Sequence, residues 1–255
     1  LLKKILLLIL TVILVLSLAA CGGKEDANPE TPASDLAYIK EKGTMVIGIT
    51  DYAPMNYKDD SGKLVGFDTE LAEKVFGNSN PIHLEIGCGK GQFAEEIAKR
   101  NPHINYIAVE QNVNVLVTAM ERTRDSGTPN LKYIMGMAEY LEKVFEKGSV
   151  QCIYLNFSCP FPKNAYAKHR LTHQRFLDIY RNILAPDGVI YQKTDNAPFF
   201  EFSLNSYCDN GFKMRNITFD LHNSKIEGNI ITEYEAKFSS MGFPIYYVEA
   251  FPQKN

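Results

Sequence analysis

From Pro81 onward, the chain alternates short apolar runs with stretches whose apolar residues recur at helical spacing. Short apolar runs bounded by turn residues predict buried strands, and we expect these at Ile82–Ile86, Tyr106–Glu110, Leu131–Ile134, Val150–Leu155 and Val189–Gln192. The amphipathic stretches between them predict helices at Gln92–Arg100, Val113–Arg124, Glu139–Glu146 and Leu171–Ile183. This alternation predicts an α/β domain with a mostly parallel sheet and helices on both faces, completed by apolar stretches near Ile217 and Tyr246.

The start of the chain follows a different pattern. Lys3 and Lys4 precede an apolar run over Ile5–Leu16, and small residues then lead to Cys21. This order is typical of a secretory signal, and the run is shorter than the ~20 residues of a membrane span. The sequence Leu-Ala-Ala-Cys resembles the lipobox of bacterial lipoproteins, which implies lipidation of Cys21. We expect residues 1–21 to be a signal peptide with its lipobox and the polar residues 22–34 to be a flexible tether.

Residues 35–77 predict a small unit of their own, with a strand at Met45–Thr50 and a helix at Asp68–Val75. The segments Ala53–Tyr57 and Gly62–Asp68 resemble the start of the amino-acid solute-binding proteins of ABC importers. That family needs two lobes of roughly a hundred residues each, whereas the resemblance here ends at Gly77. We therefore interpret residues 35–77 as a truncated solute-binding-protein fragment, fused to a second domain at residues 78–255.

Charge and cysteine content narrow the possible functions. The chain of 255 residues has a formal net charge of -3, and Pro81–Asn255 carries 19 basic and 19 acidic residues. Any affinity for nucleic acid must therefore come from a local patch. The cysteines form no metal-binding spacing, and we expect no metal site; they are Cys21, Cys88, Cys152, Cys159 and Cys208.

The first strand of the second domain runs into a glycine-rich turn with the sequence Glu-Ile-Gly-Cys-Gly-Lys-Gly over residues 85–91. Glycines permit a tight turn and let a ligand approach the backbone. A purely structural turn is the alternative interpretation. The pattern resembles motif I of S-adenosylmethionine (SAM) methyltransferases, and Glu110 ends the next strand, where a carboxylate can accept hydrogen bonds from ribose hydroxyls. The combination favours a SAM site.

Several later motifs resemble, in order and spacing, the bacterial tRNA guanine-N7 methyltransferases. They are Tyr154–Lys163, Arg170–Thr172, Lys193–Asn196, Asp220–His222 and Asn229–Glu235. The resemblance covers essentially all of Pro81–Ala250. It implies a Rossmann-like methyltransferase fold, SAM as cofactor, and methyl transfer to N7 of a guanine in the variable loop of tRNA. It implies no obligate protein partner.

The resemblance also assigns site residues. Those implied to bind the cofactor are Glu85, Gly87, Gly89, Gly91, Glu110, Met137 and Cys159. Those implied to bind the substrate are Lys163, Asp195, Thr232, Glu233, Tyr234 and Glu235, and the catalytic positions are Cys159 and Asp195. For Asp195 a helix N-cap is the alternative. The basic residues Lys163, Arg170 and Arg175 are expected to contact phosphates.

The sequence departs from the family pattern at four places. Cys159 and Met137 stand where the family has aspartate, Asn164–Tyr166 replaces a basic run, and Gln192 replaces an aromatic residue. These losses concentrate at the predicted site. They leave three hypotheses: an active tRNA methyltransferase, which is favoured, a weakened or non-catalytic relative that binds tRNA or SAM, and a solute-binding lipoprotein, which would lack its second lobe. A tRNA methyltransferase is expected in the cytoplasm, whereas the lipobox would attach the chain to a membrane.

Overall fold

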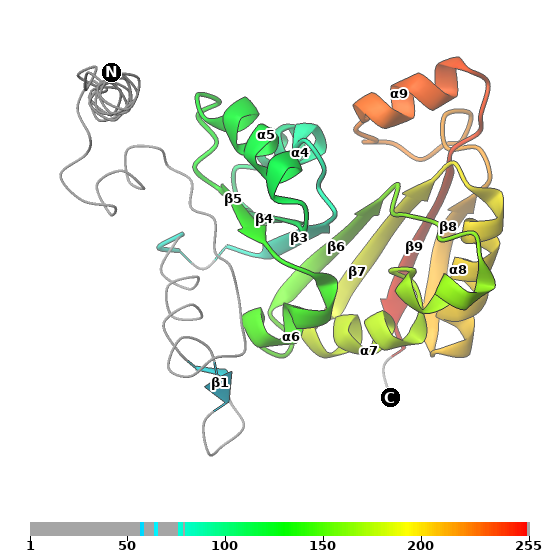
Figure 1. Ribbon diagram of the computed structural model, residues 1–255, viewed down its shortest axis with the longest axis horizontal. Coiled ribbons are helices and arrows are strands. Elements are labelled where there is room, and N and C mark those ends of the chain that lie inside the picture. Colours follow the sequence, from blue (N-terminus) through cyan, green and yellow to red (C-terminus); the bar gives the residue numbers. More distant parts are fainter. Residues whose placement is uncertain (1–56, 59–63, 66–75, 79, 254–255) are drawn as a thin grey trace, which may run out of the picture. The chain divides into compact units, whose positions relative to one another are not determined.

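The computed structural model describes residues 57–58, 64–65, 76–78 and 80–253 of the chain (Figure 1). The predicted signal peptide with Cys21, the tether and most of the solute-binding fragment lie outside these residues. Within that fragment, Tyr57–Lys58 (β1) and Leu64–Val65 (β2) pair as antiparallel strands. The division of the chain into these segments stays a prediction.

The described part of the second domain is built on a seven-stranded sheet in the order β5-β4-β3-β6-β7-β9-β8. Strands β3 to β7 pair in parallel, and β9 runs antiparallel to both β7 and β8. The mostly parallel sheet is therefore confirmed. The strands are Ile82–Ile86 (β3), Asn105–Glu110 (β4), Leu131–Met135 (β5), Val150–Asn156 (β6), Leu184–Thr194 (β7), Phe212–Thr218 (β8) and Tyr246–Pro252 (β9).

Helices cover both faces of this sheet (Figure 1). Along β4, Ile107 and Val109 join a core cluster with α6, α7 and α8, whereas Tyr106 and Ala108 join a second cluster with α4 and α5. Successive side chains of a strand point to opposite faces, so an apolar run is required where both faces are covered. The helices are Gln92–Arg100 (α4), Val113–Thr123 (α5), Leu141–Val144 (α6), Gln174–Ile183 (α7), Ala197–Asp209 (α8) and Glu233–Ser240 (α9), with short 3₁₀ turns at Ala138–Tyr140 (η1) and Asn164–His169 (η2).

Some predicted boundaries were wrong. The stretch Glu139–Glu146 is split between η1 and α6, and the helix ends where the buried Phe145 adopts an extended backbone. The helix expected from Leu171 begins at Gln174, because the extended His173 caps it and accepts the Arg175 N–H through Nδ1. Strand β7 begins directly after α7, five residues before the predicted start at Val189.

The strand order determines where a ligand can bind. The chain leaves β3 through α4 to β4 on one side, and β6 later pairs on the other side of β3. Ligands of open α/β sheets bind beyond the carboxyl ends of the strands at such a switch point. The residues that follow β3, β4 and β6 therefore border one crevice.

Helix α8 was not predicted, because polar residues interrupt its apolar face. Ser203 is fully buried and Ser206 nearly so. The Ser206 hydroxyl donates to the Thr172 carbonyl at 2.6 Å, and Ser203 Oγ lies 2.9 Å from Thr172 Oγ1. Gln192 on β7 donates its amide to Ser203 Oγ at 2.9 Å. Its Oε1 is buried without a hydrogen-bond partner among the described residues.

Replacing Gln192 by Met should raise the free energy of unfolding by about 1 kcal/mol, because an unpaired buried acceptor costs roughly 1–3 kcal/mol. Ser203 would keep its bonds to Thr172 and to the Phe199 carbonyl. Urea unfolding followed by circular dichroism measures the change. Gln151→Met, at an exposed hydrogen bond, is the matched control and should change stability by less than about 0.5 kcal/mol. A Gln192→Met variant less stable than the parent would contradict the destabilising effect of the unpaired Gln192 Oε1.

Candidate functional site

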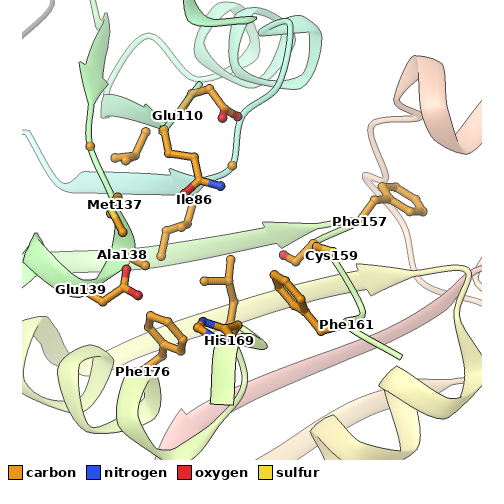
Figure 2. Close-up of a pocket in the computed structure, with 16 residues that line it drawn as sticks. Ile86, Glu110, Met137, Ala138, Glu139, Phe157, Cys159, Phe161, His169 and Phe176 are labelled. Atoms are coloured by element: carbon orange, nitrogen blue, oxygen red, sulfur yellow. The ribbon is translucent and has the colours of Figure 1, made fainter. Parts of the chain in front are cut away.

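A cavity of about 290 Å³ lies at the carboxyl ends of β3, β4 and β6. In Figure 2, Glu110 and Met137 approach it from one side, and Phe157, Cys159 and Phe161 from the other. Its volume is at the lower end of the ~300–1,000 Å³ usual for ligand pockets. The lining residues come from every segment that borders the crevice: Ile86, Gly87, Val109, Glu110, Gln111, Gly136, Met137, Ala138, Glu139, Phe157, Ser158, Cys159, Phe161, His169, Leu171 and Phe176.

The glycine-rich turn after β3 is held against β4. The N–H groups of Gly87 and Cys88 both donate to the Val109 carbonyl, at 2.8 and 3.1 Å. Gly87 and Gly89 have φ values of +80° and +57°, and a Cβ on either would meet no atom within 4 Å. The turn therefore needs glycine for its backbone conformation and leaves open space beside it. Gly91 differs, because a Cβ there would lie 2.6 Å from the Tyr133 hydroxyl and 2.8 Å from the Ala119 Cβ; this glycine lets α4 pack closely.

Glu110 presents an oriented carboxylate to the cavity. Its Oε2 accepts the Gly89 N–H at 3.1 Å, and its Oε1 accepts the Asn112 N–H at 2.9 Å. Each oxygen has two lone-pair sites, so capacity remains for a ligand's hydroxyl groups. The structure thus brings Gly87, Glu110, Met137 and Cys159 to the wall of one cavity.

Glu85 is placed differently. It alternates with Leu84 and Ile86 along β3, so it points to the opposite face of the sheet, and it is outside the residues that line the cavity. It is 2% exposed and accepts from Asn156 Nδ2 at 2.9 Å and from the Tyr106 hydroxyl at 3.3 Å. Burial raises the pKa of Glu85 to about 7, and the donors from Asn156 and Tyr106 and the charge of Lys193 limit the rise.

Among the residues predicted to bind the substrate, Asp195 follows β7 and accepts the Tyr234 hydroxyl at 3.4 Å. The N-cap interpretation of Asp195 was wrong, because Asn196 caps α8 and accepts the Phe199 N–H at 2.9 Å. The ring of Phe157, which lines the cavity, lies 4.9 Å from the ring of Tyr234. Asp195 and the start of α9 are therefore connected to the cavity wall through Tyr234.

Comparison with known proteins identifies the family. Residues 79–248 match the family described as "Putative methyltransferase". The tRNA (guanine-N(7)-)-methyltransferase of Listeria monocytogenes serotype 4a is 50% identical over 183 residues, which cover 72% of this chain and 86% of that relative. The relative of the same name from Brevibacillus brevis is 52% identical, with 69% and 82% covered, and that from Bacillus subtilis is 50% identical, also with 69% and 82% covered.

The chain belongs to the tRNA (guanine-N(7)-)-methyltransferase family. Solved structures add the fold. The 16S rRNA methyltransferase KamB has a TM-score of 0.56 at 15% identity, over 78% of this chain and 100% of that one. A 30S ribosomal A1408 methyltransferase from an uncultured bacterium has a TM-score of 0.52 at 12% identity, over 78% and 99%. The Rossmann-like methyltransferase fold is thereby confirmed.

The cavity of this family member fits SAM. Its apolar residues Ile86, Val109 and Ala138 suit an adenine ring, and Glu110 suits a ribose. The open turn at Gly87 suits the amino-acid end. Ser158, on the same wall, has a buried hydroxyl without a partner among the described residues, as expected of a group that a ligand would engage.

The three basic residues predicted to contact phosphates, Lys163, Arg170 and Arg175, differ in their surroundings. Lys163 is exposed, as expected. The prediction that Arg170 contacts a phosphate was wrong. The residue is only 9% exposed, and its guanidinium donates to the carbonyls of Pro160 and Phe161 at 2.9 and 3.0 Å. Arg175 pairs with Glu139 at 2.6 Å. Both arginines therefore hold the walls of the cavity.

Several residues of this cavity wall were not predicted from the sequence. His169, Phe161 and Phe176 line the cavity, and the Phe161 and His169 rings lie 5.6 Å apart. Phe157 and Phe161 have φ values of +52° and +41°, which are uncommon for non-glycine residues and often occur at functional sites. Nothing in the sequence marks these backbone conformations.

Among the described residues, no group of three or more histidine, cysteine, aspartate or glutamate side chains could hold a metal ion. In the same part of the chain, no helix combines the length and the apolar character needed to cross a membrane.

Replacing Glu85 by Gln should remove a pH-dependent destabilisation. The pKa of Glu85 is about 7 in the folded chain and ~4.3 in an unfolded one. Its contribution to stability is therefore present below pH ~4 and is lost as the pH rises through 7, by about 3 kcal/mol. Urea unfolding should show Glu85→Gln more stable than the parent at pH 8 and similar to it at pH 4.5.

Glu96→Gln, at an exposed ion pair with Arg100, is the control and should show no such gain at pH 8. Equal stability of the parent and Glu85→Gln at both pH values would contradict the raised pKa.

Proposed function

We propose that this chain transfers the methyl group of SAM to N7 of a guanine in the variable loop of tRNA. The observation that carries the proposal is the cavity with its glycine turn and Glu110, connected through Phe157 to Tyr234 and Asp195. The relatives that are half identical over most of their length carry the name of this activity. The solute-binding alternative has no support among the described residues.

The chemistry places modest demands on the side chains. SAM supplies an electrophilic methyl group, and guanine N7 already carries a free lone pair. No general base is needed to create the nucleophile, so the chain's task is to hold the base in line, and orientation of this kind can lower a barrier by several kcal/mol.

We assign the substrate-side roles to residues near the start of α9. Asp195 and Glu233 would accept hydrogen bonds from the guanine N1–H and N2–H₂ edge, and Tyr234 would orient Asp195. A carboxylate there would also stabilise the positive charge that develops on the ring. Glu233 is half exposed and pairs with Arg122, so it can be reached by a base. Exposed Lys163 and Lys168 are the remaining candidates for phosphate contact.

The substitutions at Met137 and Cys159 bear on the rate. Both side chains are exposed on the cavity wall, and the family pattern has aspartate at both positions. We propose that their loss leaves a slow enzyme rather than an inactive one, because the positions of Glu110, Asp195 and Glu233 are retained. Cys159 has no need to act as a nucleophile, since N7 methylation requires no covalent intermediate.

The compartment follows from the substrates. Transfer from SAM to tRNA would take place in the cytoplasm, and membrane attachment would depend on use of the lipobox at Cys21. We retain the division into residues 1–21, 22–34, 35–77 and 78–255 as part of the proposal.

Restoring the aspartates should raise the activity. Cys159→Asp and Met137→Asp should each increase methyl transfer up to about a hundredfold, the usual value of one well-placed hydrogen-bonding group. The assay follows labelled methyl from SAM into unmodified tRNA and locates N7-methylguanosine by mass spectrometry of the digested product. Cys208→Asp, at an exposed cysteine on α8, is the matched control.

The comparison of the four proteins separates the hypotheses. A measurable rate in the parent that rises in Cys159→Asp and Met137→Asp, but not in Cys208→Asp, supports a weakened enzyme. A fast parent with no gain would contradict the roles of positions 137 and 159. No transfer by any of the four proteins would contradict the proposed function and favour a relative that only binds.

A further inference from the structure

A buried cluster of charged and amide groups lies at the start of α9. Glu235 is 0% exposed. Its Oε1 lies 2.8 Å from His222 Nε2 and accepts from Asn229 Nδ2 at 2.7 Å. Its Oε2 accepts from Lys193 Nζ at 2.6 Å and from the Thr232 N–H at 3.4 Å. Donors from β7, from the loop before α9 and from α9's own N-terminus therefore converge on one carboxylate.

Lys193 uses all its donors within the same cluster. Besides Glu235, its Nζ donates to Asn229 Oδ1 at 3.0 Å and to the Ile230 carbonyl at 2.9 Å. The Phe93 and Phe157 rings lie 5.3 and 5.8 Å from the ammonium. Burial lowers the pKa of Lys193, whereas the Glu235 charge raises it. Burial likewise opposes the charge on Glu235, but Lys193 and the hydrogen-bond donors hold the pKa of Glu235 below its usual value.

These bonds divide the segment Thr232–Glu235 into two inward and two outward residues. Thr232 Oγ1 accepts the Glu235 N–H at 2.9 Å in a capping box, so Thr232 and Glu235 serve the structure of α9. Glu233 and Tyr234 are exposed to 59% and 44%. With its oxygens occupied by four donors and no exposed surface, Glu235 is poorly placed to receive a base.

Tyr234 connects this cluster to the reaction site. Its hydroxyl donates to Asp195, and its ring contacts Phe157 on the cavity wall. Lys193 lies near the end of β7, two residues before Asp195, which follows that strand. The ion pair between Lys193 and Glu235 therefore fixes how far the outward face of α9 stands from the cavity.

We propose that Lys193, with His222 and Asn229, is a positioning residue of the methyl transfer: it holds Glu235, and with it α9, so that Glu233, Tyr234 and Asp195 meet the target nucleotide. Glu235 then acts within the protein and makes no contact with the guanine. This inference rests on the proposed function.

The test replaces Lys193 by Met in the full chain. The affinity for tRNA, measured by fluorescence anisotropy, should fall roughly tenfold to a hundredfold, as expected when a binding group is misplaced. The affinity for S-adenosylhomocysteine, measured by calorimetry, should stay within about twofold, because the cofactor cavity is outside the cluster. Amide hydrogens of residues 232–240 should exchange faster, whereas those of α5 should not.

Two further variants separate the positioning role of Lys193 from loss of positive charge and from loss of folding stability. Lys237→Met removes an exposed lysine from the same helix and should leave tRNA affinity within about twofold, which separates positioning from general attraction. The double variant Lys193→Met, Glu235→Gln removes the uncompensated buried charge and should recover folding stability, but it should keep the weak tRNA binding and the fast exchange.

Different results would contradict the positioning role of Lys193 and the proposed methyl transfer. Unchanged tRNA affinity in Lys193→Met, an equal loss in Lys237→Met, or unchanged exchange in α9 would overturn the positioning role. A parent chain that binds tRNA but transfers no methyl group would contradict the proposed function alone, and the loss of tRNA affinity in Lys193→Met would still support the inference.

Discussion

The ion pair between Lys193 and Glu235 is the interaction that holds the start of α9 and the proposed substrate residues beside it in place. Two opposite charges buried together require close mutual contact and further hydrogen bonds, because an unpaired buried charge is strongly destabilising. The pair obtains these bonds from His222, Asn229 and the Ile230 carbonyl. In doing so it ties β7 and the loop before α9 to the start of that helix. The charge of Lys193 also limits the pKa rise of Glu85 on β3, so one ammonium group acts on two of the buried carboxylates, Glu85 and Glu235.

The cofactor side depends on the sheet instead. Parallel pairing of β3 with both β4 and β6 brings the carboxyl ends of these strands together, and the glycine turn and Glu110 follow directly from that placement. Half of the site is therefore determined by strand order and the other half by a polar cluster. Met137 and Cys159 lie outside the strands and outside the polar cluster, so neither the sheet pairing nor the cluster depends on aspartates at these positions.

Much of this arrangement could be predicted from the sequence. The strands β3 to β6 and helix α4 produce clear apolar periodicity, and the motifs around Gly87 and Glu110 lie where the sheet topology requires. Helix α8 could not be predicted, because buried Ser203 and Ser206 form hydrogen bonds inside the core and break the apolar pattern. The inward direction of Glu235 and the burial of Arg170 were also beyond the sequence, since partners such as Lys193 and the Pro160 carbonyl are distant along the chain or lie in an irregular loop.

A crystal structure of the chain with S-adenosylhomocysteine would show which cavity receives the cofactor. A second cavity, also of about 290 Å³ and lined by Phe93, Tyr154, Tyr191 and Lys193 among others, lies on the sheet face that carries α4. We expect density for the ligand in the first cavity, against Gly87 and Glu110 and within contact of Cys159. Ligand in the second cavity, or none in the first at saturating concentration, would show that the first cavity is not the SAM site.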